Sequence, residues 1–276
     1  MRTDWRLIED EHRDGAWNMA VDEAIMLAVA AERVPPTLRL YGWDPAAVSL
    51  GYFQDADEGV DRAAIARLGF GLVRRPTGGR AILHDDEVTY SVAIREADIP
   101  HGHSVMGSYR VISRGIEAGL QRLGVGAQLV DKRPNVPEAK AGELPTVCFA
   151  KASRCDMVVD GRKIVGSAQV RRDGAILQHG SVPMTIDLDD HAAVMPGVAG
   201  NSEKLSDAAC GVADALGRCI TFGELAAAIV AGFPEALGVE LTTAALTPDE
   251  LAEAERLYRD KFSTDQWNLS RGKPQG

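Results

Sequence analysis

The chain has 276 residues, of which 45% are hydrophobic and 25% are charged, as in one large globular domain or a domain with a small appendage. Its formal net charge of -10 argues against a general nucleic-acid binder. The sequence has no apolar run near the roughly 18 residues of a membrane span, no apolar signal-peptide core, and no disulfide-like cysteine spacing. We therefore expect a cytoplasmic monomer that binds neither nucleic acid nor membrane.

Hydrophobic periodicity predicts alternating helices and strands in the first half of the chain. A helix is predicted over 18–34, then strands over 37–43 and 47–53, a short helix over 60–68, and strands over 71–74 and 88–94. A strong amphipathic helix is predicted over 104–123. The Pro-rich stretch 132–147 is predicted to be a loop, and a loop of that length is often functional.

The second half begins with a predicted three-strand meander. Asp-Gly pairs at 160–161 and 173–174 between apolar runs are typical of hairpin turns. Helices are then predicted over 222–236 and 247–261. Helices mixed with antiparallel strands, without a βαβ rhythm, favour an α+β fold with a mixed, largely antiparallel sheet and flanking helices.

The segment Arg74–Arg80, RRPTGGR, could bind an anion or a carbonyl. Paired glycines let backbone N–H groups approach a ligand, and arginines add positive charge. The segment is neither a P-loop nor a dinucleotide fingerprint. On composition alone, the simpler interpretation is a glycine turn with solvated arginines.

A cysteine and a lysine offer the other candidate chemistry. Cys148 leaves a Pro-rich loop, and Lys163 follows the first Asp-Gly turn in an otherwise apolar strand. A nearby ammonium is a common way of activating a thiol, although a free cysteine is more often a small buried residue. His84 and His179 could act as bases or donors, with a structural histidine as the default interpretation. The spacing of Cys148, Cys155 and His179 fits no zinc pattern, and we expect no metal.

Together these segments resemble the family of lipoate-protein ligases and octanoyltransferases, which is related to biotin protein ligases. The similarity lies in RRPTGGRAILHD (74–85), DMVVDGRKIVGSAQ (156–169), AILQHGS (175–181) and PPTLRLYGWDPAAVSLGYFQ (35–54). The chain is most similar to the LipM-type octanoyltransferase branch, through Val147–Ala150 and Ser108–Arg110. The resemblance implies a ligase-like catalytic domain over about 1–200, at most to 240, with a mostly helical extension over 200–276 packed on it.

The resemblance also implies which residues form the site. Cys148 would carry the acyl group as a thioester, and Lys163 would stabilise its thiolate. An acyl pocket would be lined by Arg75, Gly78, Gly79, His84, Gly166, Ser167, Ala168 and Gly180.

The implied activity is octanoyl transfer in lipoate biosynthesis. The octanoyl group would pass from acyl carrier protein through the cysteine thioester to a lysine of a lipoyl-type domain, without a cofactor. The acceptor would be the glycine cleavage H protein or the E2 subunit of a 2-oxoacid dehydrogenase. Three alternatives stay open: an ATP-dependent lipoate or octanoate ligase, an amidotransferase that moves octanoyl between lipoyl domains, and a non-catalytic lipoyl- or biotin-binding regulator.

Overall fold

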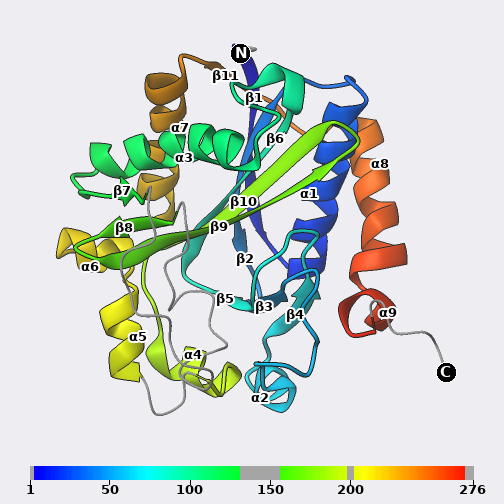
Figure 1. The fold of residues 1–276 in the computed structure, drawn as a ribbon. Coiled ribbons are helices and arrows are strands. Elements are labelled where there is room, and N and C mark those ends of the chain that lie inside the picture. Colours follow the sequence, from blue (N-terminus) through cyan, green and yellow to red (C-terminus); the bar gives the residue numbers. More distant parts are fainter. Residues whose placement is uncertain (1–2, 131–155, 198–201, 271–276) are drawn as a thin grey trace.

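An eight-stranded sheet runs through the molecule in the order β11-β1-β2-β6-β10-β9-β8-β7 (Figure 1). The computed structural model describes residues 3–130, 156–197 and 202–270. The strands of this sheet are Asp4–Arg13 (β1), Thr37–Trp43 (β2), Glu87–Arg95 (β6), Gln128–Leu129 (β7), Met157–Val159 (β8), Arg162–Arg172 (β9), Ala175–Pro183 (β10) and Glu240–Thr243 (β11). β1 pairs in parallel with β2 and β11, and the other neighbours are antiparallel.

A smaller sheet, in the order β4-β3-β5, lies below the large one in Figure 1. Its strands are Ala47–Leu50 (β3), Gly71–Arg74 (β4) and Ile82–His84 (β5). The helices around it are Arg62–Arg67 (α2), Leu188–Val194 (α4) and Ser202–Ala208 (α5). Val48, Leu50, Leu83 and Val194 belong to its apolar core. The glycine turn predicted at 74–80 therefore connects two strands of this small sheet.

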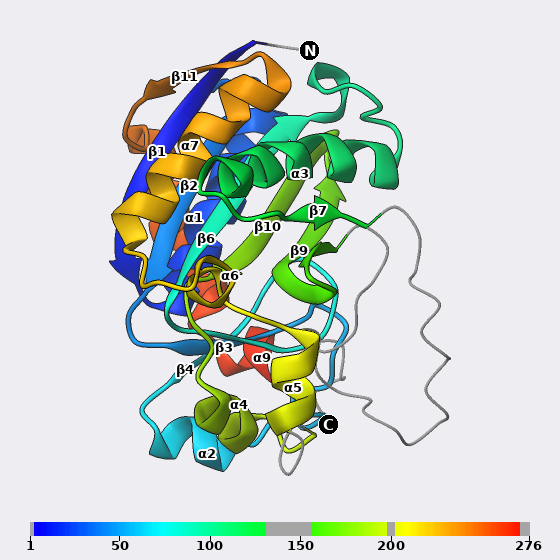
Figure 2. The ribbon, with the colours of Figure 1, turned by 90° about the vertical axis from the view of Figure 1, so that its left-hand side faces the viewer.

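Helices cover both faces of the large sheet (Figure 2). The helices on one face are Gly15–Ala30 (α1) and Pro248–Leu257 (α8), and those on the other are Val105–Arg122 (α3) and Phe222–Leu237 (α7). Shorter segments are Glu96–Asp98 (η1), Val212–Leu216 (α6), Tyr258–Phe262 (η3) and Asp265–Asn268 (α9). The sheet is thus the middle of three layers.

Local sequence accounts for the meander and for the close packing of two helices. Asp160, Gly161, Asp173 and Gly174 all have positive φ, as the two tight hairpin turns require. α3 and α7 cross at glycines, where a Cβ on Gly232 would lie only 2.4 Å from the backbone nitrogen of a glycine in α3. Glycine at this position is therefore required by the approach of the two backbones.

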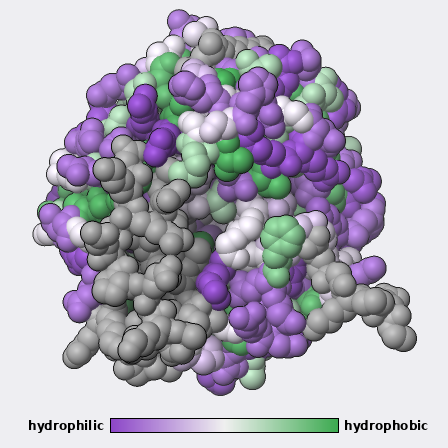
Figure 3. Space-filling view, in the orientation of Figure 1, coloured by the Kyte–Doolittle hydropathy of each residue, from purple (hydrophilic) through white to green (hydrophobic). Residues whose placement is uncertain are grey.

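Side chains alternate across the sheet, as the two-residue period of a strand dictates. On β2, Leu38 and Leu40 pack in the core under α3 and α7, whereas Arg39 points to the face covered by α1. The outer surface in the view of Figure 3 is mainly hydrophilic, with small separate apolar patches. No helix in the described ranges has the length and apolar character needed to cross a bilayer.

The predicted α+β fold with a mixed, largely antiparallel sheet is confirmed. Strands 37–43 and 71–74 appear with the predicted bounds, and the meander appears as β8, β9 and β10. β1 and β11 were not predicted. β1 carries mostly charged residues, with only Trp5, Leu7 and Ile8 buried as apolar side chains.

Candidate active site

The glycine turn after β4 is held by buried arginines. Arg74 is 2% exposed and donates hydrogen bonds to the carbonyl oxygens of Gly51, Gln54 and Asn268. Its guanidinium therefore fastens the turn to the preceding loop and to α9. Arg75 is also buried, so the interpretation of both residues as solvated arginines is wrong, whereas Arg80 is exposed.

Arg75 closes the turn on itself. Its Nη2 donates to the carbonyl oxygens of Gly78 (2.8 Å) and Arg80 (2.7 Å), and its Nη1 donates to both oxygens of Ser49 at 3.0 Å. A guanidinium is a rigid fork of donors, so these bonds fix the turn geometry. Each of these hydrogen bonds joins Arg75 to another group of the protein.

Gly78 and Gly79 form the tip of the turn, where Gly78 is half-buried and Gly79 is exposed. Gly79 has φ of 95°, and a Cβ on Gly78 would meet no atom within 4 Å. Within the described residues, the amide N–H groups of Gly78 and Gly79 donate to no protein acceptor. The backbone of Gly79 packs closely on Gly51, where a Cβ would lie 1.9 Å from the Gly79 carbonyl oxygen. The turn therefore offers backbone donors on a fixed support.

The predicted lining residues of β9 and β10 face one another across the two strands. Gly180 pairs with Ser167, and Ala168 pairs with His179. A Cβ on Gly180 would lie 2.4 Å from Ser167 Oγ and 2.6 Å from the Tyr90 ring, so the position requires glycine. Ser167 Oγ is 2.7 Å from Tyr90 Oη.

Lys163 lies on β9, three residues before Gly166. Its side chain is 4% exposed, and its Nζ is 3.1 Å from Asp156 Oδ1, whose side chain is 2% exposed. The alternative of a solvated turn lysine is therefore wrong. The carbonyl oxygen of Lys163 accepts a hydrogen bond from the backbone N–H of Cys210 (3.0 Å). Burial raises the pKa of the Cys210 thiol, which makes it a poor nucleophile.

His179 connects the glycine turn to α1. Its Nε2 is 2.7 Å from Thr77 Oγ1, and its Nδ1 is 3.2 Å from Asp22 Oδ2. Asp22 also accepts from Arg39, Tyr41 and Ser91. Burial would raise the pKa of Asp22, but the hydrogen bond from His179 and the charge of Arg39 outweigh it and hold that pKa below its usual value. Burial lowers the pKa of His179.

His84 forms a second chain of the same kind. Its Nε2 is 2.8 Å from Ser49 Oγ, and its Nδ1 is 2.9 Å from Glu87 Oε1. The ring also stacks on Trp43, with centroids 4.0 Å apart. Both nitrogens of each histidine thus contact protein groups, as the default interpretation of structural histidines expects.

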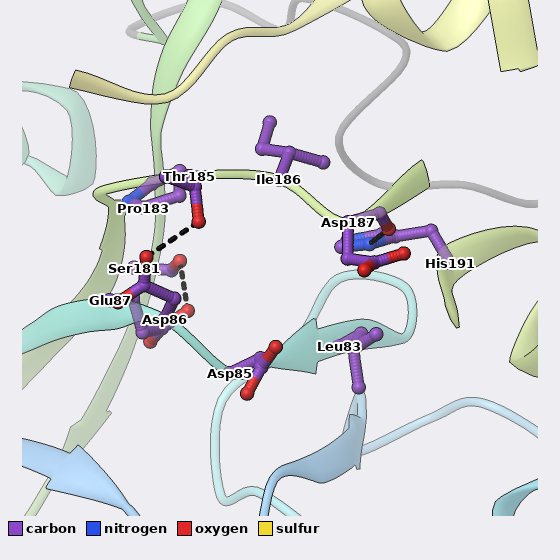
Figure 4. A pocket seen from close by; sticks show the side chains of 10 residues that line it. All are labelled: Leu83, Asp85, Asp86, Glu87, Ser181, Pro183, Thr185, Ile186, Asp187 and His191. Atoms are coloured by element: carbon purple, nitrogen blue, oxygen red, sulfur yellow. Dashed lines mark hydrogen bonds between the residues drawn. The ribbon is translucent and has the colours of Figure 1, made fainter. Parts of the chain in front are cut away.

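A small pocket lies beyond Glu87, beside the turn between β10 and α4 (Figure 4). Its volume is about 20 Å³, which is room for about one water. Burial, together with the charges of Asp86 and its neighbouring carboxylates, raises the pKa of Asp85. Ser181 donates to Glu87, and Thr185 donates to Asp86. The pocket is too small for an acyl chain.

The structure therefore joins two predicted segments at one place. The Thr77–His179 hydrogen bond links the glycine turn to β10, next to Gly180 and opposite Ala168. Cys148 and Cys155 lie outside the described residues. The sequence does not point to the buried carboxylates Asp22, Glu87 and Asp156, because a carboxylate on a helix or at the start of a strand is usually an exposed charge.

Comparison with known proteins extends the similarity over nearly the whole chain. Residues 14–234 match the model of the lipoyl protein ligase A/B catalytic domain. A protein of Symbiobacterium thermophilum named octanoyltransferase LipM is 46% identical, covering 98% of this chain and 99% of that protein. The Bacillus subtilis protein of the same name is 35% identical over 97% and 98%.

Solved structures show the same fold. A lipoate-protein ligase A bound with ATP superposes with a TM-score of 0.79 at 28% identity, covering 96% of this chain and 98% of that one. The bipartite lipoate protein ligase of Thermoplasma acidophilum, studied with its E2 lipoyl domain, gives 0.78 at 25% identity, with 99% of each chain covered. This chain belongs to the family of the lipoyl protein ligase A/B catalytic domain.

Proposed function

We propose that this protein is an octanoyltransferase of lipoate biosynthesis that works through a cysteine thioester. The observation that carries the proposal is the full-length similarity to proteins named octanoyltransferase LipM, at 35% to 46% identity. The burial of Lys163 and the N–H groups of the glycine turn support the proposal, because acyl transfer requires groups that stabilise developing negative charge.

The first half-reaction loads the enzyme. The Cys148 thiolate attacks the carbonyl carbon of octanoyl-acyl carrier protein, and the carbonyl oxygen becomes an oxyanion. Collapse forms the Cys148 thioester and expels the carrier thiolate, which takes up a proton. One thioester replaces another, so no nucleotide is needed.

The second half-reaction unloads the enzyme onto a lipoyl-domain protein. The neutral amine of a lysine attacks the Cys148 thioester, forms an amide, loses a proton and releases the thiolate. This acceptor class is supported by the archaeal ligase of the same fold, studied with its E2 lipoyl domain. Two half-reactions through one thiol predict ping-pong kinetics.

Lys163 is the cation proposed to act on both halves. An ammonium favours a thiolate and stabilises a developing oxyanion. Asp156 forms an ion pair with Lys163 inside the protein, with 3.1 Å between Oδ1 and Nζ. The N–H groups of Gly78 and Gly79 are the proposed backbone donors to the same oxyanion.

Intact-protein mass spectrometry tests this proposal directly. The enzyme is mixed with octanoyl-acyl carrier protein without ATP, and a hydroxylamine-labile octanoyl adduct is expected. Cys148→Ala should abolish the adduct, while the matched control Cys210→Ala, which removes a buried thiol beside Lys163, should retain it. Full transfer by Cys148→Ala would contradict the covalent scheme.

The main rival is an ATP-dependent ligase, and the ATP-bound ligase with the same fold favours it as a second candidate. A ligase would activate free octanoate as an acyl-adenylate. AMP release that depends on free octanoate, together with no adduct from acyl carrier protein, would establish the ligase in place of the transferase.

A further inference from the structure

Two chains of acid, histidine and hydroxyl converge on the glycine turn. One runs from Asp22 through His179 to Thr77, and the other from Glu87 through His84 to Ser49. We propose that His179 is a positioning residue, which accepts a hydrogen bond from the Thr77 hydroxyl and thereby holds Gly78 and Gly79 in the geometry that receives the acyl carbonyl. This inference rests on the proposed function for the identity of the ligand.

The donor and acceptor roles in the first chain follow from its buried carboxylate, that of Asp22. Asp22 is completely buried, and its oxygens already accept from Arg39, Tyr41 and Ser91. A carboxylate can only accept, so Nδ1 of His179 must carry a proton and donate to it. The imidazole is 6% exposed, and burial lowers its pKa, which favours the neutral ring.

A neutral ring protonated at Nδ1 leaves Nε2 as an acceptor. Thr77 is therefore the donor in the 2.7 Å contact, and its rotamer is fixed by that bond. Thr77 is fully buried, and its carbonyl oxygen accepts from the backbone N–H of Tyr52. The hydroxyl and the carbonyl oxygen of Thr77 are thus fixed one residue before the tip of the turn.

The second chain supports the other side of the turn. Glu87 accepts from His84 and Ser181, and His84 contacts Ser49. Ser49 Oγ accepts from Arg75, whose guanidinium also binds the carbonyl oxygen of Gly78. The guanidinium of Arg75 consequently connects the Ser49 hydroxyl on β3 to the carbonyl oxygen of Gly78 at the tip of the turn.

This arrangement matters because the N–H groups of Gly78 and Gly79 donate to no acceptor in the part of the chain that the structure describes. Backbone donors stabilise an oxyanion only when they are held in place before the reaction. A displacement of about 1 Å can reduce the rate on the order of a hundredfold. The two chains therefore hold the N–H groups of the otherwise flexible Gly78 and Gly79 in a fixed direction.

The test uses Thr77→Val, which keeps the side-chain shape and removes the hydroxyl, and Thr77→Ser, which keeps the hydroxyl. Thr37→Val is the matched control, because Thr37 is similarly buried and its hydroxyl donates to the Pro35 carbonyl and accepts from Arg6 Nε, away from the turn. The first readout is amide hydrogen exchange at Gly78 and Gly79. The second is transfer kinetics with octanoyl-acyl carrier protein.

Thr77→Val should speed exchange at the two glycines and lower kcat about ten- to a hundredfold, with a smaller change in KM. Thr77→Ser should keep most of the parent's protection from exchange and most of its kcat. Thr37→Val should match the parent in both measurements. Thr77→Val with unchanged exchange would overturn the inference, and so would Thr77→Ser behaving like Thr77→Val.

Nitrogen-15 chemical shifts of His179 test the same inference without any substitution. A ring protonated at Nδ1 and unprotonated at Nε2 is expected, and the opposite tautomer would overturn the inference. Exchange and tautomer do not depend on the donor thioester. Their success together with an absence of octanoyl transfer would reject the proposed function while supporting the positioning role.

Discussion

The two faces of the large sheet are built from the same strands but have different roles, one in stability and the other in orienting the candidate site. On β2, β6 and β10, one set of alternating residues, such as Leu40, Val92 and Ile176, packs in the apolar core under α3 and α7. The other set, which includes Arg39 and His179, meets α1 and forms a buried polar network around Asp22. The apolar face gains stability from burial, whereas the polar face orients the candidate site through directional bonds.

The difference between the two faces predicts that a conservative substitution should lower the free energy of unfolding far more on the polar face than on the apolar face. Asp22→Asn keeps the shape of the side chain but removes the charge facing Arg39 and replaces an acceptor by a donor. We expect a loss of about 3–5 kcal/mol in the free energy of unfolding, because the Arg39 charge stays buried. Urea unfolding at pH 7.5 measures it, and a loss below about 1 kcal/mol would contradict the importance of this network.

The second prediction concerns the buried ion pair on β9. Lys163→Met keeps the aliphatic stem but leaves the Asp156 carboxylate without its ammonium, and should cost about 1–3 kcal/mol of unfolding free energy. Adding Asp156→Asn should recover much of that stability, since the buried negative charge is removed.

Octanoyl transfer should stay low in both of these variants. Recovery of stability without recovery of activity would separate the two roles of Lys163. A double variant that regains transfer would show that its charge is not needed in the reaction.

The third prediction addresses the apolar face. Ile116 in α3 is completely buried within the core under α3 and α7. Ile116→Val removes one methylene group and should cost only about 0.5–1.5 kcal/mol, with transfer rates unchanged. A loss as large as that of Asp22→Asn would remove the proposed contrast between the two faces.

The same contrast explains what the sequence could predict. The apolar periodicity of α3 and the Asp-Gly turns of the meander are local signals, and both predictions are confirmed. The role of Asp22 has no local signal. It lies on a helix, while its partners come from β2, β6 and β10, so only the assembled sheet brings them together.

β11 was missed for a related reason. Its residues are mostly exposed, and it is defined by parallel pairing with β1, which lies more than 200 positions away in sequence. The Gly-Gly segment and Lys163 were recognised as motifs. The burial of Arg74 and Arg75, however, depends on carbonyl groups from separate loops.

The last prediction is a pH dependence that arises from two buried histidines, His179 on the polar face and His191 in α4. Burial lowers the pKa of His179 and His191 below the ordinary value near 6.5. Below that pH the unfolded chain takes up protons that the folded protein resists, so the free energy of unfolding should fall as the pH decreases from 6.5 toward the folded pKa values. Asp22, Arg75 and His84 are the charged or titratable groups that act on His179 in the folded state.

Urea unfolding at pH 7.5, 6.5 and 5.5 would measure this slope. Thr77→Val should change it, because the substitution removes the hydroxyl that donates to neutral His179 and leaves Nε2 free to bind a proton. Ile116→Val should lower stability equally at every pH, since the apolar face has no titrating group at that position. If Thr77→Val and Ile116→Val gave equal slopes of unfolding free energy against pH, the protonation of His179 would not be coupled to the glycine turn.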